Sequence, residues 1–210
     1  MQQHIKAIET FYKGYHFRSR LEARWAVFFD TLGVSWEYEA EGYQNEAGST
    51  KYLPDFKLGN GLFVEVKGDP KALIKEHDRY VQMLDFGGIL PNFSDSFYND
   101  DSVNGLILLG DIPEPSTAKV CFHPIIQHHK GLVKSWGMFF NSQYHPFDLV
   151  KDSVLSRLLG LSPCHGLEAD DTNWEIQTYQ LPAHKYYKEL YEAYAAARAA
   201  RFEHGQKGVA

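Results

Sequence analysis

The chain has 210 residues, of which 44% are hydrophobic and 23% are charged, and its formal net charge is −6. This composition excludes disordered and collagen-like chains, because enough apolar side chains are present for a sizeable core. Two cysteines cannot build a disulfide framework, and no apolar run reaches the roughly 20 residues that span a bilayer. We therefore expect one cytoplasmic domain over residues 1–204, a flexible tail over residues 205–210 and no membrane association.

Charge is unevenly distributed along the chain. The acidic balance excludes a protein that coats nucleic acid through bulk positive charge, but it leaves room for a local basic groove. Residues 1–24 contain five basic and two acidic side chains, whereas residues 91–118 contain five acidic and no Lys or Arg side chains. Any basic face is therefore expected in the N-terminal part of the chain.

The segment FRSRLEARWAVFFDTL, residues 17–32, predicts an amphipathic helix because its apolar side chains recur at steps of three and four residues. Ser19 can cap the start of this helix, and Glu22, three residues later, completes a capping-box pattern. Gly33 is expected to end it. The capping role is one explanation for Glu22, and a functional role is the alternative.

The elements after this helix predict an α/β fold. Two short β-rich runs, YLPDFKL and LFVEVKG, flank Gly59-Asn60-Gly61 and predict a hairpin, since glycine accepts the positive φ of a tight turn. The apolar run GLILLGDI predicts a strand covered on both faces. The other expected elements are strands at 34–43, 120–127 and 133–140, helices at 70–84, 147–161 and about 183–204, and a loop at 87–105. The strand at 120–127 is expected to break at Pro124. Together they indicate a mixed central sheet flanked by helices.

The predicted hairpin carries the residues with the clearest chemical potential. Pro54-Asp55 lies on its first strand and Glu65-Val66-Lys67 on its second. Because side chains alternate along a strand, Glu65 and Lys67 point the same way. A three-residue turn would place Asp55 directly opposite Glu65, with Cβ atoms within about 5.5 Å. The sequence therefore predicts two carboxylates in one site.

Two carboxylates at this range repel each other, so one takes up a proton unless a cation lies between them. Hard oxygen ligands that leave positions for water suit Mg²⁺ or Mn²⁺. Lys67 can orient an attacking water or, as a neutral amine, deprotonate it, and its ammonium form can balance charge on a phosphoryl group. An arginine bridge that left no room for solvent would argue against this interpretation.

The pattern PD-x9-ExK, with the Glu-bearing helix before it, resembles the signature of the PD-(D/E)XK nuclease superfamily. The resemblance covers roughly residues 17–68, and the longer string is also similar to uncharacterised nuclease-like proteins of bacteriophages and bacteria. It implies a restriction-endonuclease-like fold and a Mg²⁺-dependent endonuclease that hydrolyses DNA. It further implies Asp55 and Glu65 as metal ligands, with the Val66 carbonyl and Glu22 as further ligands, and Lys67 as the catalytic lysine.

Several alternatives remain open from the sequence. Arg18, Arg20 and Arg24 lie near Glu22 and either contact nucleic-acid phosphates or form a solvated helix face. The tyrosines at 186–194 are helix-packing residues or the face of a homodimer. The histidines and cysteines at 121–129 and 164–165 match no established zinc-binding spacing. The rival functions are a catalytically inactive DNA- or protein-binding module and a nuclease acting on RNA or branched DNA.

Overall fold

The computed structural model describes residues 8–59, 61–69, 72, 77–84, 89–91, 93–95, 100–115, 120–121, 123–129, 132–140, 147–150, 178–179 and 187–202. Its helices are α1 (Arg20–Leu32), α3 (His77–Leu84) and α5 (Tyr187–Ala199). Its strands are β1 (Thr10–Tyr12), β2 (Tyr15–Phe17), β3 (Trp36–Tyr38), β4 (Tyr43–Gln44), β5 (Lys51–Tyr52), β6 (Phe56–Leu58), β7 (Phe63–Val66), β8 (Phe93–Asp95), β9 (Asp100–Leu109), β10 (Val120–Cys121), β11 (His123–His129), β12 (Leu132–Phe140), β13 (Phe147–Val150) and β14 (Thr178–Tyr179).

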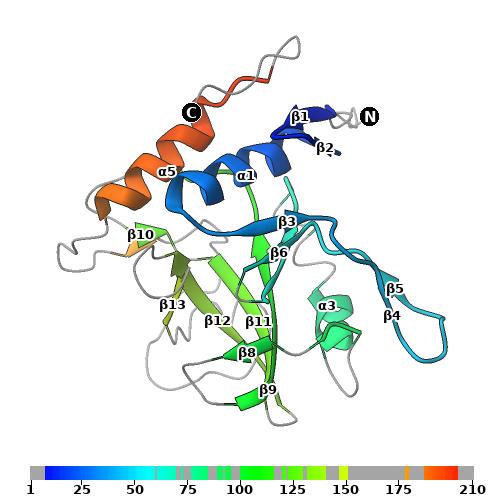
Figure 1. Cartoon of the computed structure of the whole chain (residues 1–210). Helices are drawn as coiled ribbons and strands as arrows, with labels where there is room; N and C mark the ends of the chain where they lie inside the picture. Colours follow the sequence, from blue (N-terminus) through cyan, green and yellow to red (C-terminus); the bar gives the residue numbers. More distant parts are fainter. Residues whose placement is uncertain are drawn as a thin grey trace, which may run out of the picture.

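A mixed sheet forms the centre of the molecule (Figure 1). Its order is β13-β12-β11-β9-β7-β6-β3, and β8 adds to β9. The β7–β9 pair is parallel and the other neighbouring pairs of this sheet are antiparallel. The expected mixed α/β architecture is confirmed. No helix in the described ranges has the length and hydrophobicity needed to cross a membrane.

Helices cover both faces of the sheet. Alternation along β7 sends Val64 and Val66 into a core shared with α1 and α5, and Phe63 into a second core shared with α3. Strand β9 alternates in the same way, so it is buried on both sides, as its apolar sequence predicts. Figure 1 shows α5 alongside α1, with α3 apart from both.

Helix α1 forms as the sequence predicts. The side chain of Ser19 accepts a hydrogen bond from the Glu22 N–H, and Gly33 ends the helix in the left-handed conformation at φ 77°. The buried stripe includes Trp25, Phe28 and Phe29, which face the core.

Three sequence expectations differ from the structure. The expected loop at 87–105 contains β8 and the first half of β9, and the start of the expected helix at 147–161 is the strand β13. Residues 151–161 lie outside the described part of the chain. Strand β11 continues through Pro124, because this residue lies opposite Gly137 of β12 and before Ile125, where pairing with β9 begins.

The C-terminal helix is shorter than expected where it is described. The prediction covered about 183–204, whereas α5 spans Tyr187–Ala199 and residues 200–202 follow it without helical structure. Residues 183–186, 203–204 and the predicted tail at 205–210 lie outside the described part.

Candidate active site

The β6–β7 hairpin brings Asp55 and Glu65 together. Phe56 pairs with Val64 and Lys57 with Phe63, so the same register places Asp55 opposite Glu65. The turn between the strands closes with a 2.8 Å hydrogen bond from the Leu58 N–H to the Leu62 carbonyl. Gly61, directly before Leu62, has φ 91°, which an L side chain rarely adopts. The hairpin register expected from the sequence is therefore present.

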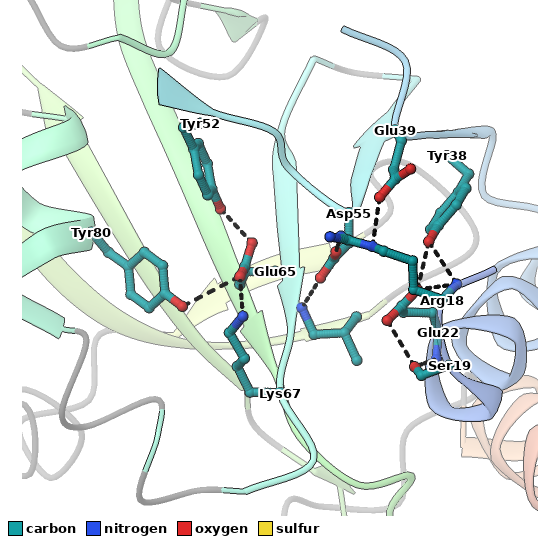
Figure 2. Close-up of polar contacts among 11 residues, drawn as sticks. Arg18, Ser19, Glu22, Tyr38, Glu39, Tyr52, Asp55, Glu65, Lys67 and Tyr80 are labelled. Atoms are coloured by element: carbon teal, nitrogen blue, oxygen red, sulfur yellow. Dashed lines mark hydrogen bonds and ion pairs between the residues drawn. The ribbon is translucent and has the colours of Figure 1, made fainter. Parts of the chain in front are cut away.

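Asp55 is buried directly before the start of β6, and both of its carboxylate oxygens have partners (Figure 2). Its Oδ2 accepts a 2.7 Å hydrogen bond from the Val66 N–H, and its Oδ1 pairs with Arg18 Nη2 at 2.5 Å. The Arg18 Nε also lies 2.6 Å from Glu39 Oε1. The Arg18 side chain is 57% exposed, so solvent reaches this ion pair.

Glu65 is also buried, and its contacts come from three directions (Figure 2). Tyr52 donates a 2.6 Å hydrogen bond to Oε2, and Tyr80 of α3 donates a 3.4 Å hydrogen bond to Oε1. The Nζ of Lys67 lies 2.7 Å from the same Oε1, and its side chain is 32% exposed. Lys67 therefore connects a buried carboxylate with the solvent, on the side of β7 that strand alternation predicts.

The electrostatic environment of Asp55 differs from that of a surface aspartate. Burial raises its pKa to about 7, and the negative charge of Glu65 acts in the same direction. The hydrogen bond from Val66 and the charge of Arg18 lower this pKa, and the carboxylate of Glu22 raises it. The two neighbouring carboxylates thus add to the effect of burial, and a cation beside Asp55 would favour its ionised form.

Glu22 lies at the border of this site. Its carboxylate is buried and accepts hydrogen bonds from the Tyr38 hydroxyl at 2.6 Å, the Ser19 hydroxyl at 2.7 Å and the Arg18 N–H at 3.1 Å. The contact with Ser19 shows the capping function expected from the sequence, while the effect of Glu22 on the Asp55 pKa places it within electrostatic range of the carboxylate pair.

The three arginines singled out in the sequence have different surroundings. Arg18 precedes α1 and contacts the carboxylates, whereas Arg20 and Arg24 lie on α1 two residues before and after Glu22. At 3.6 residues per turn, a two-residue step rotates a side chain by about 200° around the helix. Arg20 and Arg24 therefore leave α1 on the side opposite Glu22 and do not join the carboxylates.

Four contributors to this site were missed by the sequence interpretation: Tyr38, Glu39, Tyr52 and Tyr80. Tyr38 pairs with Phe56 across β3 and β6, and this register was not readable from the sequence. Tyr52 lies three residues before Asp55, so proximity to the PD dipeptide was a usable signal. Tyr80 reaches Glu65 from α3, a contact that depends on how the helix packs against the sheet.

Comparisons with known proteins place the similarity on this same part of the chain. Residues 3–84 match the family model described as Phage endonuclease I. Endonuclease I of Escherichia phage T7 is 43% identical over 54 residues, which are 25% of this chain and 36% of that relative. The match therefore spans about a third of the curated relative's length. No solved structure matches the chain. The N-terminal region of this protein is thus similar to a family of phage endonucleases.

Proposed function

We propose that the protein is a metal-dependent endonuclease of the PD-(D/E)XK type that hydrolyses DNA phosphodiester bonds. The observation that carries the proposal is the pairing of two buried carboxylates, Asp55 and Glu65, with the ammonium of Lys67 lying 2.7 Å from Glu65. The similarity to Phage endonuclease I supports it, because the matched residues 3–84 include this hairpin and Glu22.

The residues present fit a hard divalent cation such as Mg²⁺ or Mn²⁺. Burial and the negative charge of Glu65 both raise the pKa of Asp55, so an added cation favours its ionised form, and the cation beside it in the structure is the Arg18 guanidinium. Asp55 and Glu65 would hold the ion together with the Val66 carbonyl and, as an outer or second ligand, Glu22. When bound, such an ion supplies a Lewis acid and a water of lowered pKa.

The side chains of the chain itself have separate tasks in this proposal. Lys67 reaches from Glu65 to the solvent, where its ammonium orients the attacking water and balances developing negative charge, or its neutral amine accepts the proton of that water. The exposed guanidinium of Arg18 binds a phosphate oxygen, for which its planar array of donors is suited. Tyr52 and Tyr80 fix the orientation of the Glu65 carboxylate.

The test is cleavage of supercoiled plasmid in the presence of Mg²⁺ or Mn²⁺, with single-stranded DNA, branched DNA and RNA as further substrates. Asp55→Ala is expected to reduce the rate to background, and Lys67→Ala to reduce it by about a hundredfold or more. Glu114→Ala, which removes an exposed carboxylate outside the hairpin, is the control and should cut as the wild type does. Equal rates for wild type and Asp55→Ala would refute the proposal.

A catalytically inactive nucleic-acid-binding module is the second candidate, and one observation favours it. All carboxylate oxygens of Asp55 and Glu65 already have partners within the chain. Calorimetric titration with Mn²⁺ separates the two functions. Binding heat that disappears in Asp55→Asn supports the enzyme, whereas DNA binding without any metal-binding heat supports the module.

A further inference from the structure

Helices α1 and α5 pack antiparallel along one another. Tyr194, near the middle of α5, stacks against Phe28 with ring centroids 4.6 Å apart. Trp25 of α1 and Arg198, one turn after Tyr194, both donate to carbonyls of residues 110–112, at 2.8 Å and 2.9 Å. The C-terminal half of α5 therefore lies beside the first half of α1, and Figure 1 shows the two helices alongside one another.

This packing gathers four arginines, which we call the arginine cluster: Arg20, Arg24, Arg198 and Arg201. The cluster is evident at Arg24. Burial lowers its pKa, and the nearby positive charges of the other three arginines lower it further. Asp111 is the carboxylate that acts in the opposite direction. The four guanidinium groups of the cluster face one carboxylate, that of Asp111, so the local potential is strongly positive although the net charge of the chain is −6.

The arginine cluster keeps donor capacity for an external anion. Arg198 Nη1 donates to the Ile112 carbonyl at 2.9 Å, and Arg201 Nη1 donates to carbonyls at the end of α5 at 3.2 to 3.4 Å. The Nε of Arg24 is buried and has no hydrogen-bond partner in the described part of the chain. No carboxylate forms an ion pair with any of the four among the described residues. Arg198 and Arg201 are exposed and each guanidinium has five N–H donors, so most donors of these two side chains remain open to a ligand.

The position of the arginine cluster relative to the carboxylate pair determines which phosphate of a substrate it can bind. Arg20 and Arg24 leave α1 on the side opposite Glu22, so an anion bound there is separated from the carboxylate pair by the helix itself. A helix with its side chains is about 10 Å across, which exceeds the distance between neighbouring phosphates of one strand. The cluster therefore cannot hold the scissile phosphate, but it can hold backbone further along the same substrate.

We propose that the arginine cluster on α1 and α5 binds the phosphate backbone of DNA that flanks the cleaved bond. The identification of the ligand as DNA rests on the proposed nuclease function. The planar guanidinium group of arginine can donate two parallel hydrogen bonds to one phosphate group. Several adjacent guanidinium groups therefore suit the regularly spaced phosphates of DNA better than the irregular carboxylates of an acidic protein surface. Half of the cluster comes from α5 and the residues directly after it, which lie outside residues 3–84, the part of the chain that is similar to Phage endonuclease I.

The experiment measures binding of a labelled DNA duplex by fluorescence anisotropy in EDTA, where no divalent ion is present, over a series of salt concentrations. Arg198→Gln/Arg201→Gln is expected to weaken binding by about tenfold at low salt and to make the slope of log K against log salt less negative by about 2. Arg198→Lys/Arg201→Lys keeps both charges and is expected to restore most of the slope. Lys188→Gln removes one charge from the other end of α5, where Lys188 pairs with Glu192, and should bind as the wild type does.

Arg198 contacts the Ile112 carbonyl, so the double glutamine variant is accompanied by Arg201→Gln alone, which leaves that contact in place. A slope reduced by about 1 in the single variant supports the proposal. The proposal is overturned if both glutamine variants bind like Lys188→Gln, or if the wild type does not bind the duplex. Loss of binding in these variants of a protein that does not cleave DNA would instead reject the nuclease function and leave the DNA-binding surface standing.

Discussion

At Asp55, effects of opposite sign act on one carboxyl group. Burial and the neighbouring carboxylate of Glu65 favour the protonated form, while the Val66 N–H and the Arg18 guanidinium favour the ionised form. The balance raises the pKa to about 7, so this group changes charge near neutral pH. A carboxyl group in this state is sensitive to any added cation, which is the property a metal ligand requires.

The first prediction concerns the stability of Asp55→Asn as a function of pH. The folded-state pKa is about 7 and the unfolded value about 3.9, so Asp55 contributes stability below pH 4 that is lost as the pH rises to 7. Asp55→Asn does not lose stability in this way, because asparagine does not ionise. Between pH 4 and pH 7 its free energy of unfolding should therefore rise relative to that of the wild type, by up to about 1.4 kcal/mol per pH unit.

Urea unfolding at several pH values measures this difference. Glu114→Gln serves as the control, since it changes an exposed carboxylate for which no such dependence is expected. A difference between wild type and Asp55→Asn that stays constant from pH 4.5 to pH 7.5 would contradict the prediction.

The carboxylates were predictable from the sequence and most of their partners were not. Asp55 and Glu65 follow from strand alternation and the length of the turn, both of which are local properties. Arg18 was expected either to contact phosphate or to lie on a solvated helix face, whereas in the structure its guanidinium contacts Asp55. Its second carboxylate contact, Glu39, comes from the segment after β3, and that approach is set by tertiary packing.

Helix α1 shows how one element combines stability with placement of the site. Its cap residue Ser19 accepts from the Glu22 N–H at 3.2 Å and donates to the Glu22 carboxylate at 2.7 Å. The same carboxylate lies within electrostatic range of Asp55. The start of the helix is thus held by the side chain that borders the carboxylate pair.

Ser19→Ala is expected to lower the free energy of unfolding by about 1 to 2 kcal/mol, because it removes the cap and one donor to a buried carboxylate. Ser35→Ala, at an exposed serine in the loop after α1, should change it by less than about 0.5 kcal/mol. Chemical denaturation of the three proteins measures both values. The prediction fails if the two variants are equally stable.

Elements with strong local signals were predicted correctly, and elements that depend on partners were not. The caps and apolar stripe define α1, and the glycine turn defines the β6–β7 hairpin. Strands β8 and β13 lack such signals, since β8 pairs with β9 and β13 pairs with β12 only in the assembled sheet. Polar residues such as Asp95 and Asp100 favour a loop locally, and their pairing overrides this preference.

At the scale of the whole molecule, the C-terminal helix α5 is joined to the central sheet through a buried polar contact. His123 Nε2 lies 2.7 Å from the Tyr194 hydroxyl, and Trp25 packs edge-to-face against the His123 ring with centroids 5.3 Å apart. Burial lowers the pKa of His123 to about 3, so the ring is neutral at physiological pH. Strand β11, α1 and α5 therefore meet around one uncharged hydrogen-bonded pair.

Tyr194→Phe should lower the free energy of unfolding by about 1 to 3 kcal/mol, because it removes this hydrogen bond from a fully buried ring nitrogen. Tyr191→Phe is the matched control, since Tyr191 lies on the same helix and is 40% exposed. Its effect should stay within about 0.5 kcal/mol. Thermal and urea unfolding of both variants provide the measurement, and similar losses in the two would contradict the assigned role of the pair.

The packing of α5 against α1 has a consequence for folding during protein synthesis. The carboxylates and their lysine emerge from the ribosome within the first third of the chain, whereas the buried side chains of α5, including Leu190 and Tyr194, emerge near the end. Until then, the apolar side of α1 that contains Phe28 stays uncovered and the early segments lack their final support. A nascent polypeptide therefore acquires its chemically competent residues long before it can hold them rigidly.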